Sequence, residues 1–351
     1  MILLHYPQSL PHSPRQLRAL ALGMLLSVTA SSCHKADLSQ HQESRPLMGT
    51  LVDIVTEGTD PARLVSATDA AYVEMTRLSD MMNHYNPDSV VSAINNNAGV
   101  RPVAVPVELM QVLLRAQSMS QFTDGAFDIT VGSLKGWRFS SDHPVMPDPK
   151  SIAALLPLVN YRNLVLDESA GSAFLRRKGM RIDLGGIAKL YILNAGIDVL
   201  KKNQVTHAMI NGGGDVAVIG SHHGRPWRIG IRDPLNPDRL YAAVELHNGF
   251  VVSSGDYERY FDRGGRRYHH ILDPKTGYPT QGPRAVTLIS EDMNRVNGLS
   301  SSIMVMGMAR GREIIDRNPT MQGIIFDRDG SVWVSPVLER RLIRVTQNGV
   351  P

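Results

Sequence analysis

Two glycine-rich turns on either side of one helix constrain this chain more than any other feature of its sequence. Residues 181–189 read Arg-Ile-Asp-Leu-Gly-Gly-Ile-Ala-Lys, and residues 211–215 read Asn-Gly-Gly-Gly-Asp. A short predicted strand, residues 180–184, precedes the first turn, and residues 187–202 carry apolar side chains at helical spacing after it. Because paired glycines permit a tight turn and a close approach of the backbone, this stretch predicts a strand, a glycine turn and a helix in succession.

The N-terminus of that helix is suited to an anion, because free N–H groups and the positive end of the helix dipole point at the turn. A second predicted strand, residues 206–210, leads into the second turn. A glycine turn alone is usually only a turn, and that alternative stays open. Asp183, Lys189 and Asp215 lie on or beside the two turns, so the pattern favours a phosphate or nucleotide site.

The start of the chain has the pattern of a secretory signal. Arg15 and Arg18 precede an apolar run, residues 19–30, which is too short to span a membrane as a stable helix. Small residues then lead into Cys33, the only cysteine of the chain, as in bacterial lipoprotein signals. We expect a signal peptide over residues 1–32 and a lipid on Cys33, which places the protein in the periplasm, anchored to the inner membrane.

Residues 33–46 are polar and show no periodicity, so they predict a tether between the lipid and a domain over residues 47–351. Hydrophobic residues make up 42% of the chain, enough for one large core or two closely packed ones. The net charge is +4, and the cations are scattered without a basic stripe. This charge pattern argues against a nucleic-acid partner.

The order of the predicted elements indicates an α+β fold, with antiparallel sheets packed with helices. Strands separated by turns are grouped together, and helices lie before and after them, which is unlike a doubly wound sheet. The predicted helices are residues 62–82, 107–122, 187–202, 296–308 and 311–317. The predicted strands are residues 48–57, 164–166, 180–184, 206–210, 215–219, 227–232, 241–246, 250–253, 284–290, 323–326 and 331–334.

Seven short segments, each weak alone, occur in a specific order between about residues 46 and 308. They are residues 48–50 (Met-Gly-Thr), 84–87 (His-Tyr-Asn-Pro), 123–128 (Thr-Asp-Gly-Ala-Phe-Asp), 183–189, 211–215, 253–260 (Ser-Ser-Gly-Asp-Tyr-Glu-Arg-Tyr) and 269–279, which begins His-His-Ile-Leu-Asp-Pro-Lys-Thr-Gly. In order and spacing, these segments resemble the ApbE family of FAD:protein FMN transferases.

The resemblance implies a T-fold-like α+β enzyme that binds FAD and Mg²⁺. Such an enzyme transfers FMN to a threonine hydroxyl of a client protein, expected to be a respiratory or electron-transfer flavoprotein, and releases AMP. Two other functions remain open from the residues. In the first, the chain is a lipoprotein that holds FAD without turnover. In the second, it is a pyrophosphatase that splits FAD into FMN and AMP with water.

Two side chains offer surface for a flavin or adenine ring. Met48 is soft and apolar, and it is equally suited to be a core residue. Tyr85 lies in a polar break between helices, where a large aromatic side chain favours a stacking role. The resemblance also implies nucleotide contacts from Ala126, Phe127 and Asp128. Asp128 is alternatively a helix cap.

The resemblance assigns Asp183 to FAD, and Lys189 would reach a phosphate unless it is a solvated helix lysine. His269 and His270 are adjacent on an extended segment, so they face opposite sides. We expect His270 to take the threonine proton as a base of near-neutral pKa, with the Ile271 backbone touching FAD.

The implied metal site departs from the family pattern. The family has Asp-Ala-Leu-(Ala/Ser)-Thr-Ala at the start of a late helix, where the aspartate and threonine bind Mg²⁺ with a carbonyl of the glycine turn. Residues 297–302 here read Asn-Gly-Leu-Ser-Ser-Ser. We therefore expect Gly186, Asn297, Ser300 and Ser301 to hold Mg²⁺ more weakly than a site that includes a carboxylate.

Overall fold

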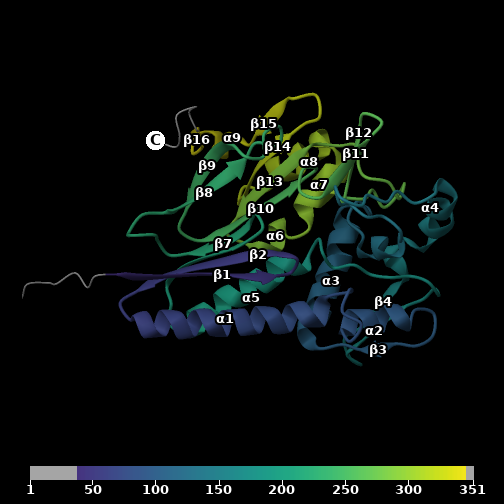
Figure 1. Cartoon of the computed structure of the whole chain (residues 1–351), viewed down its shortest axis with the longest axis horizontal. Coiled ribbons are helices and arrows are strands. Elements are labelled where there is room, and N and C mark those ends of the chain that lie inside the picture. The colour runs from purple at the N-terminus through teal and green to yellow at the C-terminus, as the bar shows by residue number, and fades with distance from the viewer. Residues whose placement is uncertain (1–37, 345–351) are drawn as a thin grey trace, which may run out of the picture. The chain divides into compact units, whose positions relative to one another are not determined.

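The computed structural model of the protein describes residues 38–344, and an eight-stranded antiparallel sheet is its central element (Figure 1). The strands lie in the order β1-β2-β6-β7-β10-β13-β14-β15, and every neighbouring pair is antiparallel. Their bounds are β1 Ser39–Leu47, β2 Thr50–Gly58, β6 His207–Gly212, β7 Asp215–Ile219, β10 Gly249–Gly255, β13 Ala285–Ser290, β14 Met321–Phe326 and β15 Val332–Val334.

Both faces of this sheet are buried. On one face, side chains such as Ile54 belong to a core shared with helices α1 (Pro61–Met82) and α5 (Ala188–Lys202), which pack against each other. On the other face, side chains such as Val55 pack with a three-stranded sheet of order β16-β9-β8. Burial on both faces explains why β7 and β13 are buried at every position rather than at alternate ones.

The remaining elements surround this sheet. The smaller sheets are β16 (Ile343–Arg344), β9 (Leu240–Leu246) and β8 (Trp227–Arg232); β3 (Val103–Ala104), β5 (Ser172–Leu175) and β4 (Leu164–Asp167); and β11 (Tyr260–Arg263) with β12 (Arg266–His269). The other helices are α2 Val90–Asn96, α3 Val107–Phe122, α4 Pro149–Leu155, α6 Met293–Val296, α7 Leu299–Met306, α8 Met308–Asp316 and α9 Pro336–Glu339, with short 3-10 turns at η1 Ile129–Ser133, η2 Leu156–Leu158 and η3 Tyr161–Asn163. The predicted α+β class with antiparallel sheets is confirmed.

Helix α1 shows how the sequence sets one of these elements. The side chain of Asp60 accepts a hydrogen bond from the Arg63 backbone, and Pro61 occupies the first turn, where its missing N–H has no cost. Residues at helical spacing, among them Leu64, Ala71 and Leu78, are buried against the sheet. The predicted bounds of this helix and of α3 agree with the structure to within one residue.

The predicted tether is wrong over most of its length. Residues 39–47 form β1, whose register runs from Ser39 opposite Gly58 to Leu47 opposite Thr50. Met48 and Gly49, predicted to begin a strand, make the tight turn, with φ of +54° and +71°. An edge strand is held by backbone hydrogen bonds and needs no apolar side chains, so its polar sequence gave no strand signal.

The predicted strand over residues 180–184 is also wrong, since the segment is extended but pairs with no strand. Met180, Ile182 and Leu184 are buried. The Asn95 side chain donates to the Ile182 carbonyl and accepts from the Ile182 N–H, at 3.1 and 2.7 Å. The segment that imitates a strand is therefore held by the side chains of Asn95 and, at Arg181, Ser133 rather than by a partner strand.

The late apolar helix is interrupted rather than continuous over residues 296–308. Asn297 ends α6, and α7 begins only at Leu299. Gly298 between them has φ of +80°, a left-handed conformation that a helix does not contain. The resemblance predicts that Asn297 and Ser301 lie on one face of a single helix. This prediction is wrong, because the two residues do not belong to one helix.

The predicted signal peptide, Cys33 and the first part of the predicted tether lie outside the described residues, as do residues 345–351. Among residues 38–344, no helix has the length and apolar character needed to cross a membrane.

The packing of α5 against α1 and β6 gives a test of this architecture. A methyl group on Gly196 would lie 2.8 Å from Met75 Sδ and 2.9 Å from Ile210 Cδ1. We expect Gly196→Ala to lower the free energy of unfolding by about 1–3 kcal/mol through overpacking, although alanine favours a helix by about 1 kcal/mol over glycine. Urea denaturation measures the difference.

Ser66→Ala, on the exposed side of α1, is the matched control and should change stability by less than about 0.5 kcal/mol. A Gly196→Ala protein as stable as the parent would show that the helices do not approach as closely as described.

Candidate active site

Three segments that are distant in the sequence meet at the first glycine turn. A Cβ on Gly186 would lie 3.2 Å from the Phe127 ring and 4.0 Å from Ser301 Oγ. A Cβ on Gly298 would lie 3.1 Å from the same ring. The buried ring of Phe127 therefore packs between the glycine turn and the start of α7, and a side chain at Gly186 or Gly298 would crowd it.

Asp183 is fixed at the entrance to this turn. Its backbone N–H donates to the Ile129 carbonyl at 2.8 Å. Its carboxylate accepts from the Gly185 N–H at 2.8 Å and lies 3.3 Å from His84 Nδ1. Burial raises the pKa of Asp183, but the hydrogen bond and charge of His84 and the Gly185 N–H outweigh it, and the pKa ends below its usual value.

Tyr85 lies next to this pair and is free to contact a ligand. Its side chain is 79% exposed, and its ring centroid is 3.9 Å from that of His84. An exposed aromatic ring beside the pair of His84 and Asp183 fits the predicted stacking role. Met48, by contrast, packs partly against the core, as the alternative interpretation of this residue proposed.

The second glycine turn joins the same region through Lys189 and Asp215. Lys189 Nζ lies 3.5 Å from Asp215 Oδ2, and the Ser253 N–H donates to Asp215 Oδ1 at 3.2 Å. Burial raises the pKa of Asp215, and the charge of Lys189 opposes that rise. Lys189 is therefore not a solvated helix lysine, since a buried carboxylate holds it beside the two turns.

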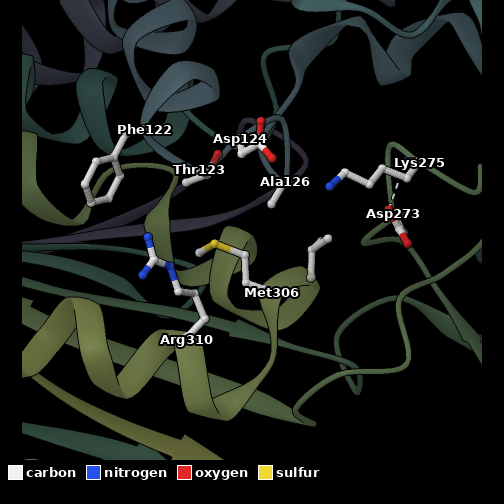
Figure 2. A pocket seen from close by; sticks show the side chains of 9 residues that line it. Phe122, Thr123, Asp124, Ala126, Asp273, Lys275, Met306 and Arg310 are labelled. Atoms are coloured by element: carbon white, nitrogen blue, oxygen red, sulfur yellow. Dashed lines mark hydrogen bonds between the residues drawn. The ribbon is translucent and has the colours of Figure 1, made fainter.

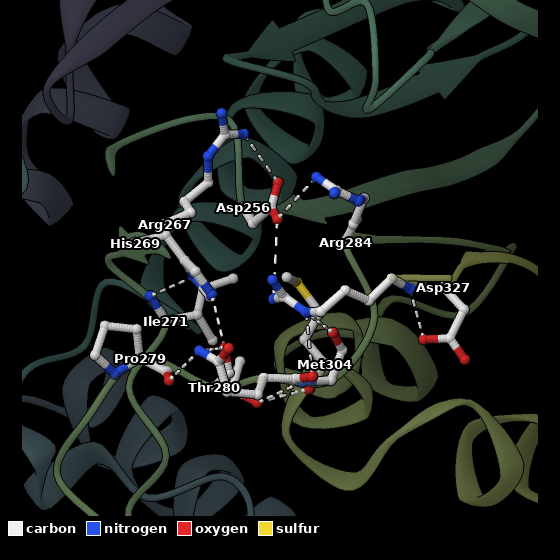
Figure 3. A network of polar contacts seen from close by, with 12 residues as sticks. Asp256, Arg267, His269, Ile271, Pro279, Thr280, Arg284, Met304 and Asp327 are labelled. Atoms are coloured by element: carbon white, nitrogen blue, oxygen red, sulfur yellow. Dashed lines mark hydrogen bonds and ion pairs between the residues drawn. The ribbon is translucent and has the colours of Figure 1, made fainter. Parts of the chain in front are cut away.

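His269 and His270 have different surroundings, as the alternation of side chains along an extended segment predicts. His269 is fully buried: its Nε2 donates to the Thr280 carbonyl at 3.0 Å, and its Nδ1 accepts from the Ile271 N–H at 3.4 Å. It lies beside a network in which Asp256 is surrounded by three arginines (Figure 3). His269 is thus structural, and Ile271, whose N–H it holds, is buried.

His270 lacks such partners. Its Nδ1 is buried and makes no hydrogen bond within residues 38–344. Burial, followed by the charges of Arg259 and His269 and a smaller effect of Lys189, lowers the pKa of His270 to about 3. The expectation of a near-neutral pKa is therefore wrong for the protein without substrate, because the imidazole lies in a buried site that already contains cations.

The nucleotide segment after α3 divides into a structural part and an open part. Asp128 is buried, and its carboxylate accepts from the Thr130 N–H and hydroxyl and from the Tyr161 N–H, at 2.8, 2.6 and 2.8 Å. With these bonds Asp128 caps the turn η1 that follows it, so the structure supports the capping alternative rather than a nucleotide contact.

Ala126, in contrast, lines a pocket of about 470 Å³. Figure 2 shows this pocket between the loop after α3, the turn at residues 273–277 and the end of α7. Lys275 and Arg310 point into it from opposite sides. Its other lining residues are Phe122, Thr123, Asp124, Asp273, Val305 and Met306.

The residues expected at a metal lie around the glycine turn, and none of them is a carboxylate. Asn297 is buried, and its Nδ2 donates to the Ile187 carbonyl at 2.9 Å. Ser301 Oγ donates to the Gly298 carbonyl at 3.2 Å, and Ser300 Oγ lies 2.8 Å from Ser254 Oγ. The structure brings Gly186 close to Ser301 and ties Asn297 to the residue after the turn, but it places Ser300 against β10.

Two contributors were missed by sequence reasoning. His84 pairs with Asp183, and Arg259 lowers the pKa of His270. Both lie within segments that carried the family resemblance, next to or near residues that were singled out. Position within those segments was the available signal. The His84 contact joins residues far apart in the sequence, whereas Arg259 and His270 flank the β11–β12 hairpin.

The lowered pKa of His270 predicts a pH effect on stability. Between pH 6.5 and about 3, the unfolded chain binds a proton at His270 that the folded chain does not, so this contribution is present above pH 6.5 and is lost as the pH falls. Between pH 7 and 5, we expect the free energy of unfolding to fall less steeply in His270→Gln than in the parent, by up to about 1.4 kcal/mol per pH unit. Urea denaturation at each pH measures it. His143→Gln, in an exposed loop, should keep the slope of the parent, and an unchanged slope in His270→Gln would place the imidazole in solvent.

Comparison with known proteins agrees with this geometry. The model of the ApbE family matches residues 48–325. A relative named FAD:protein FMN transferase, from Klebsiella pneumoniae, is 34% identical over 262 residues, covering 74% of this chain and 81% of its own. Another relative with that name, from Treponema pallidum, is 28% identical over 335 residues, covering 90% and 92%.

Two solved structures have the same fold. The ApbE protein of Thermotoga maritima has a TM-score of 0.79 and 32% identity, covering 86% of this chain and 99% of its own. The flavin transferase ApbE of Vibrio cholerae has a TM-score of 0.75 and 27% identity, covering 87% and 100%. The family model spans most of the described chain, including both glycine turns and His270, and the chain therefore belongs to the ApbE family.

Proposed function

We propose that this chain is an FAD:protein FMN transferase, which moves FMN from FAD to a threonine hydroxyl of a client protein and releases AMP. The observation that carries the proposal is His270. A neutral imidazole with an unpartnered Nδ1 lies close enough to Arg259 and Lys189 for both charges to lower its pKa. Lys189 belongs to the helix that follows the glycine turn, so a proton acceptor is placed near a phosphate-binding element.

The reaction requires one bond to form and one to break. The threonine oxygen attacks the phosphorus on the FMN side of the pyrophosphate, and the bond from that phosphorus to the bridging oxygen breaks, so that AMP leaves. The hydroxyl proton passes to His270. In the free protein this histidine is a weak base, but the negative phosphates of bound FAD offset the charges of Arg259 and Lys189 and raise its pKa.

The same elements position FAD. The N–H groups at the first glycine turn and the Lys189 ammonium face the pyrophosphate, and Asp215 keeps that ammonium in place. The exposed ring of Tyr85 provides a stacking surface. The pocket beside Ala126 accepts the rest of the nucleotide, with Lys275 and Arg310 as its cations.

Mg²⁺ is part of the proposal, and the residues present fit it as oxygen donors. The Gly186 carbonyl, Asn297 Oδ1 and the Ser301 hydroxyl would hold the ion together with the FAD phosphates. None of these protein donors is charged, so the phosphates supply the negative charge that a hard cation needs. When bound, Mg²⁺ neutralises charge on the pyrophosphate.

We further propose a place for the enzyme in the cell. Cys33 after a signal-like run fits a lipid-anchored protein on the periplasmic side of the inner membrane. A client there would be a respiratory or electron-transfer flavoprotein. This part of the proposal depends on the sequence alone, because Cys33 lies outside the described residues.

The test is an incubation of the purified protein with FAD, Mg²⁺ and a flavin-acceptor protein. We expect a fluorescent covalent flavin on the acceptor and an equal amount of AMP. In His270→Ala, transfer should fall about 100-fold with FAD affinity unchanged. In His269→Ala, the loss should be of thermal stability, because that ring holds the Thr280 and Ile271 backbone.

Other outcomes would replace the proposal. Free FMN with AMP would identify a pyrophosphatase, and bound FAD without AMP would identify a binding protein. Transfer at the parent rate by His270→Ala would remove this histidine from the mechanism.

Asn297→Asp tests the metal. Without Mg²⁺, the new carboxylate cannot donate to the Ile187 carbonyl, and we expect a loss of about 1–3 kcal/mol in the free energy of unfolding. Mg²⁺ with FAD should restore that stability. The substitution should also lower the Mg²⁺ concentration that is needed for half-maximal transfer. Thermal unfolding with and without Mg²⁺ measures the first effect independently of activity.

Asn95→Asp is the matched control. Asn95 is also buried and also donates to a backbone carbonyl, that of Ile182, but it is not among the proposed ligands. Its loss of stability should persist in Mg²⁺. An Asn297→Asp protein that Mg²⁺ fails to restore would place the ion elsewhere.

A further inference from the structure

A group of metal-binding side chains lies away from the proposed flavin site. Among residues 38–344, Glu57, His222 and His223 form the one group of at least three His, Cys, Asp or Glu residues whose ligand atoms lie within 4.8 Å of one another. Glu57 is the penultimate residue of β2, and the two histidines lie in the loop between β7 and β8. We propose that these three residues bind a divalent transition-metal ion of the Zn²⁺ class.

The distances suit such an ion. His223 Nδ1 lies 3.5 Å from Glu57 Oε1, close to the separation of about 3.4 Å that two tetrahedral ligands have at bond lengths of about 2.1 Å. His222 Nδ1 lies 2.6 Å from the same oxygen, so binding requires these two atoms to separate by a little under 1 Å. Glu57 Oε2 is already used, since it accepts from the His223 N–H at 2.8 Å.

The burial of the Glu57 carboxylate favours the binding of a cation. The Glu57 side chain is 0% exposed, whereas those of His222 and His223 are 40% and 59% exposed. Glu57 Oε1 and His222 Nδ1 are both buried atoms without a hydrogen-bond partner, despite their short separation. A buried charge and an unsatisfied lone pair are both costly. A metal ion between these atoms would satisfy them together.

The surrounding residues hold the histidines in place. His222 and Arg225 exchange two backbone hydrogen bonds, of 2.7 and 2.9 Å, which close a tight turn around His223. The ring of Trp227 stacks on that of His222, with centroids 4.8 Å apart, and its Nε1 donates to the Ile219 carbonyl at 3.0 Å. Ligands whose rings are fixed before binding lose little freedom when a metal arrives.

The donor set selects the class of metal. Two imidazoles and one carboxylate suit Zn²⁺, Cu²⁺ or Ni²⁺, whereas Mg²⁺ and Ca²⁺ prefer oxygen ligands. Three protein ligands leave a fourth position for water. At ~3.3 Å per residue, Glu57 lies about 23 Å along β2 from Thr50, which approaches the second glycine turn. The proposed metal site is therefore remote from the second glycine turn, and the proposal is independent of the flavin chemistry. A bound ion would tie the β7–β8 loop to the sheet, because its ligands come from both.

The test uses the full chain after treatment with a chelator, with Zn²⁺ and Cu²⁺ as probes. Calorimetric titration should show a Zn²⁺ site that His222→Ala, His223→Ala and Glu57→Gln each weaken at least about tenfold. Cu²⁺ should quench the fluorescence of Trp227, because that ring stacks on a ligand. Trp227→Phe should remove this quenching and keep the Zn²⁺ site.

His247→Ala is the matched control. This exposed histidine is also near the end of β7, with its Nδ1 3.1 Å from the Gly220 carbonyl, but it is not one of the three ligands. It should bind Zn²⁺ like the parent. Should Glu57→Gln fail to fold, the two histidine variants, on an exposed loop, still decide the matter.

Three results would each overturn the proposal. They are the absence of Zn²⁺ binding by the parent, parent-like affinity in both histidine variants, and Cu²⁺ quenching that survives in Trp227→Phe. Any of them would leave Glu57 and the histidines as ion pairs only.

Discussion

The close approach of one aromatic ring to two glycines organises the proposed active site. Phe127 packs against Gly186 on one side and Gly298 on the other, and a Cβ at these positions would lie 3.2 and 3.1 Å from the ring, closer than ordinary van der Waals contact. This packing joins the loop after α3, the turn before α5 and the start of α7. The turn carries N–H groups and a carbonyl that a pyrophosphate and a metal would need, so in the proposed function the geometry of phosphate binding would depend on the absence of two side chains.

Electrostatics in the site is balanced for an anionic substrate. Burial, Arg259 and Lys189 keep His270 neutral, and Asp215 offsets only the second of these cations. The free protein thus holds a proton acceptor that is too weak to compete for protons in solution. Bound phosphates would strengthen it where the substrate lies. In the proposed mechanism, a single event, the binding of FAD, would both fill the site and activate its base.

The sequence predicted the long helices α1, α3 and α5 and most of the main sheet, because these elements combine clear periodicity with local signals such as the cap of α1 at Asp60. It failed where backbone hydrogen bonds act without apolar side chains, as in β1, and where one distant side chain imitates a strand partner, as Asn95 does for Ile182. In the site, the opposite faces of His269 and His270 followed from alternation alone. The contacts of His84 and Glu57 could not be predicted, since each joins residues far apart in the sequence. The contact of Arg259 with His270 depends on the β11–β12 hairpin, which was not among the predicted strands.

The amide of Asn297 illustrates how a neutral residue can serve where the family pattern has an aspartate. An aspartate there would set a carboxylate against the Ile187 carbonyl, and only a bound cation would offset the repulsion. Asn297 instead donates to that carbonyl, so the residues after the turn are held before any metal or substrate arrives. The proposed site would therefore be ordered without Mg²⁺ and would bind the ion through oxygens of FAD as much as through its own. Metal and substrate binding would then be strongly coupled, because each supplies charge that the other needs and the protein does not provide.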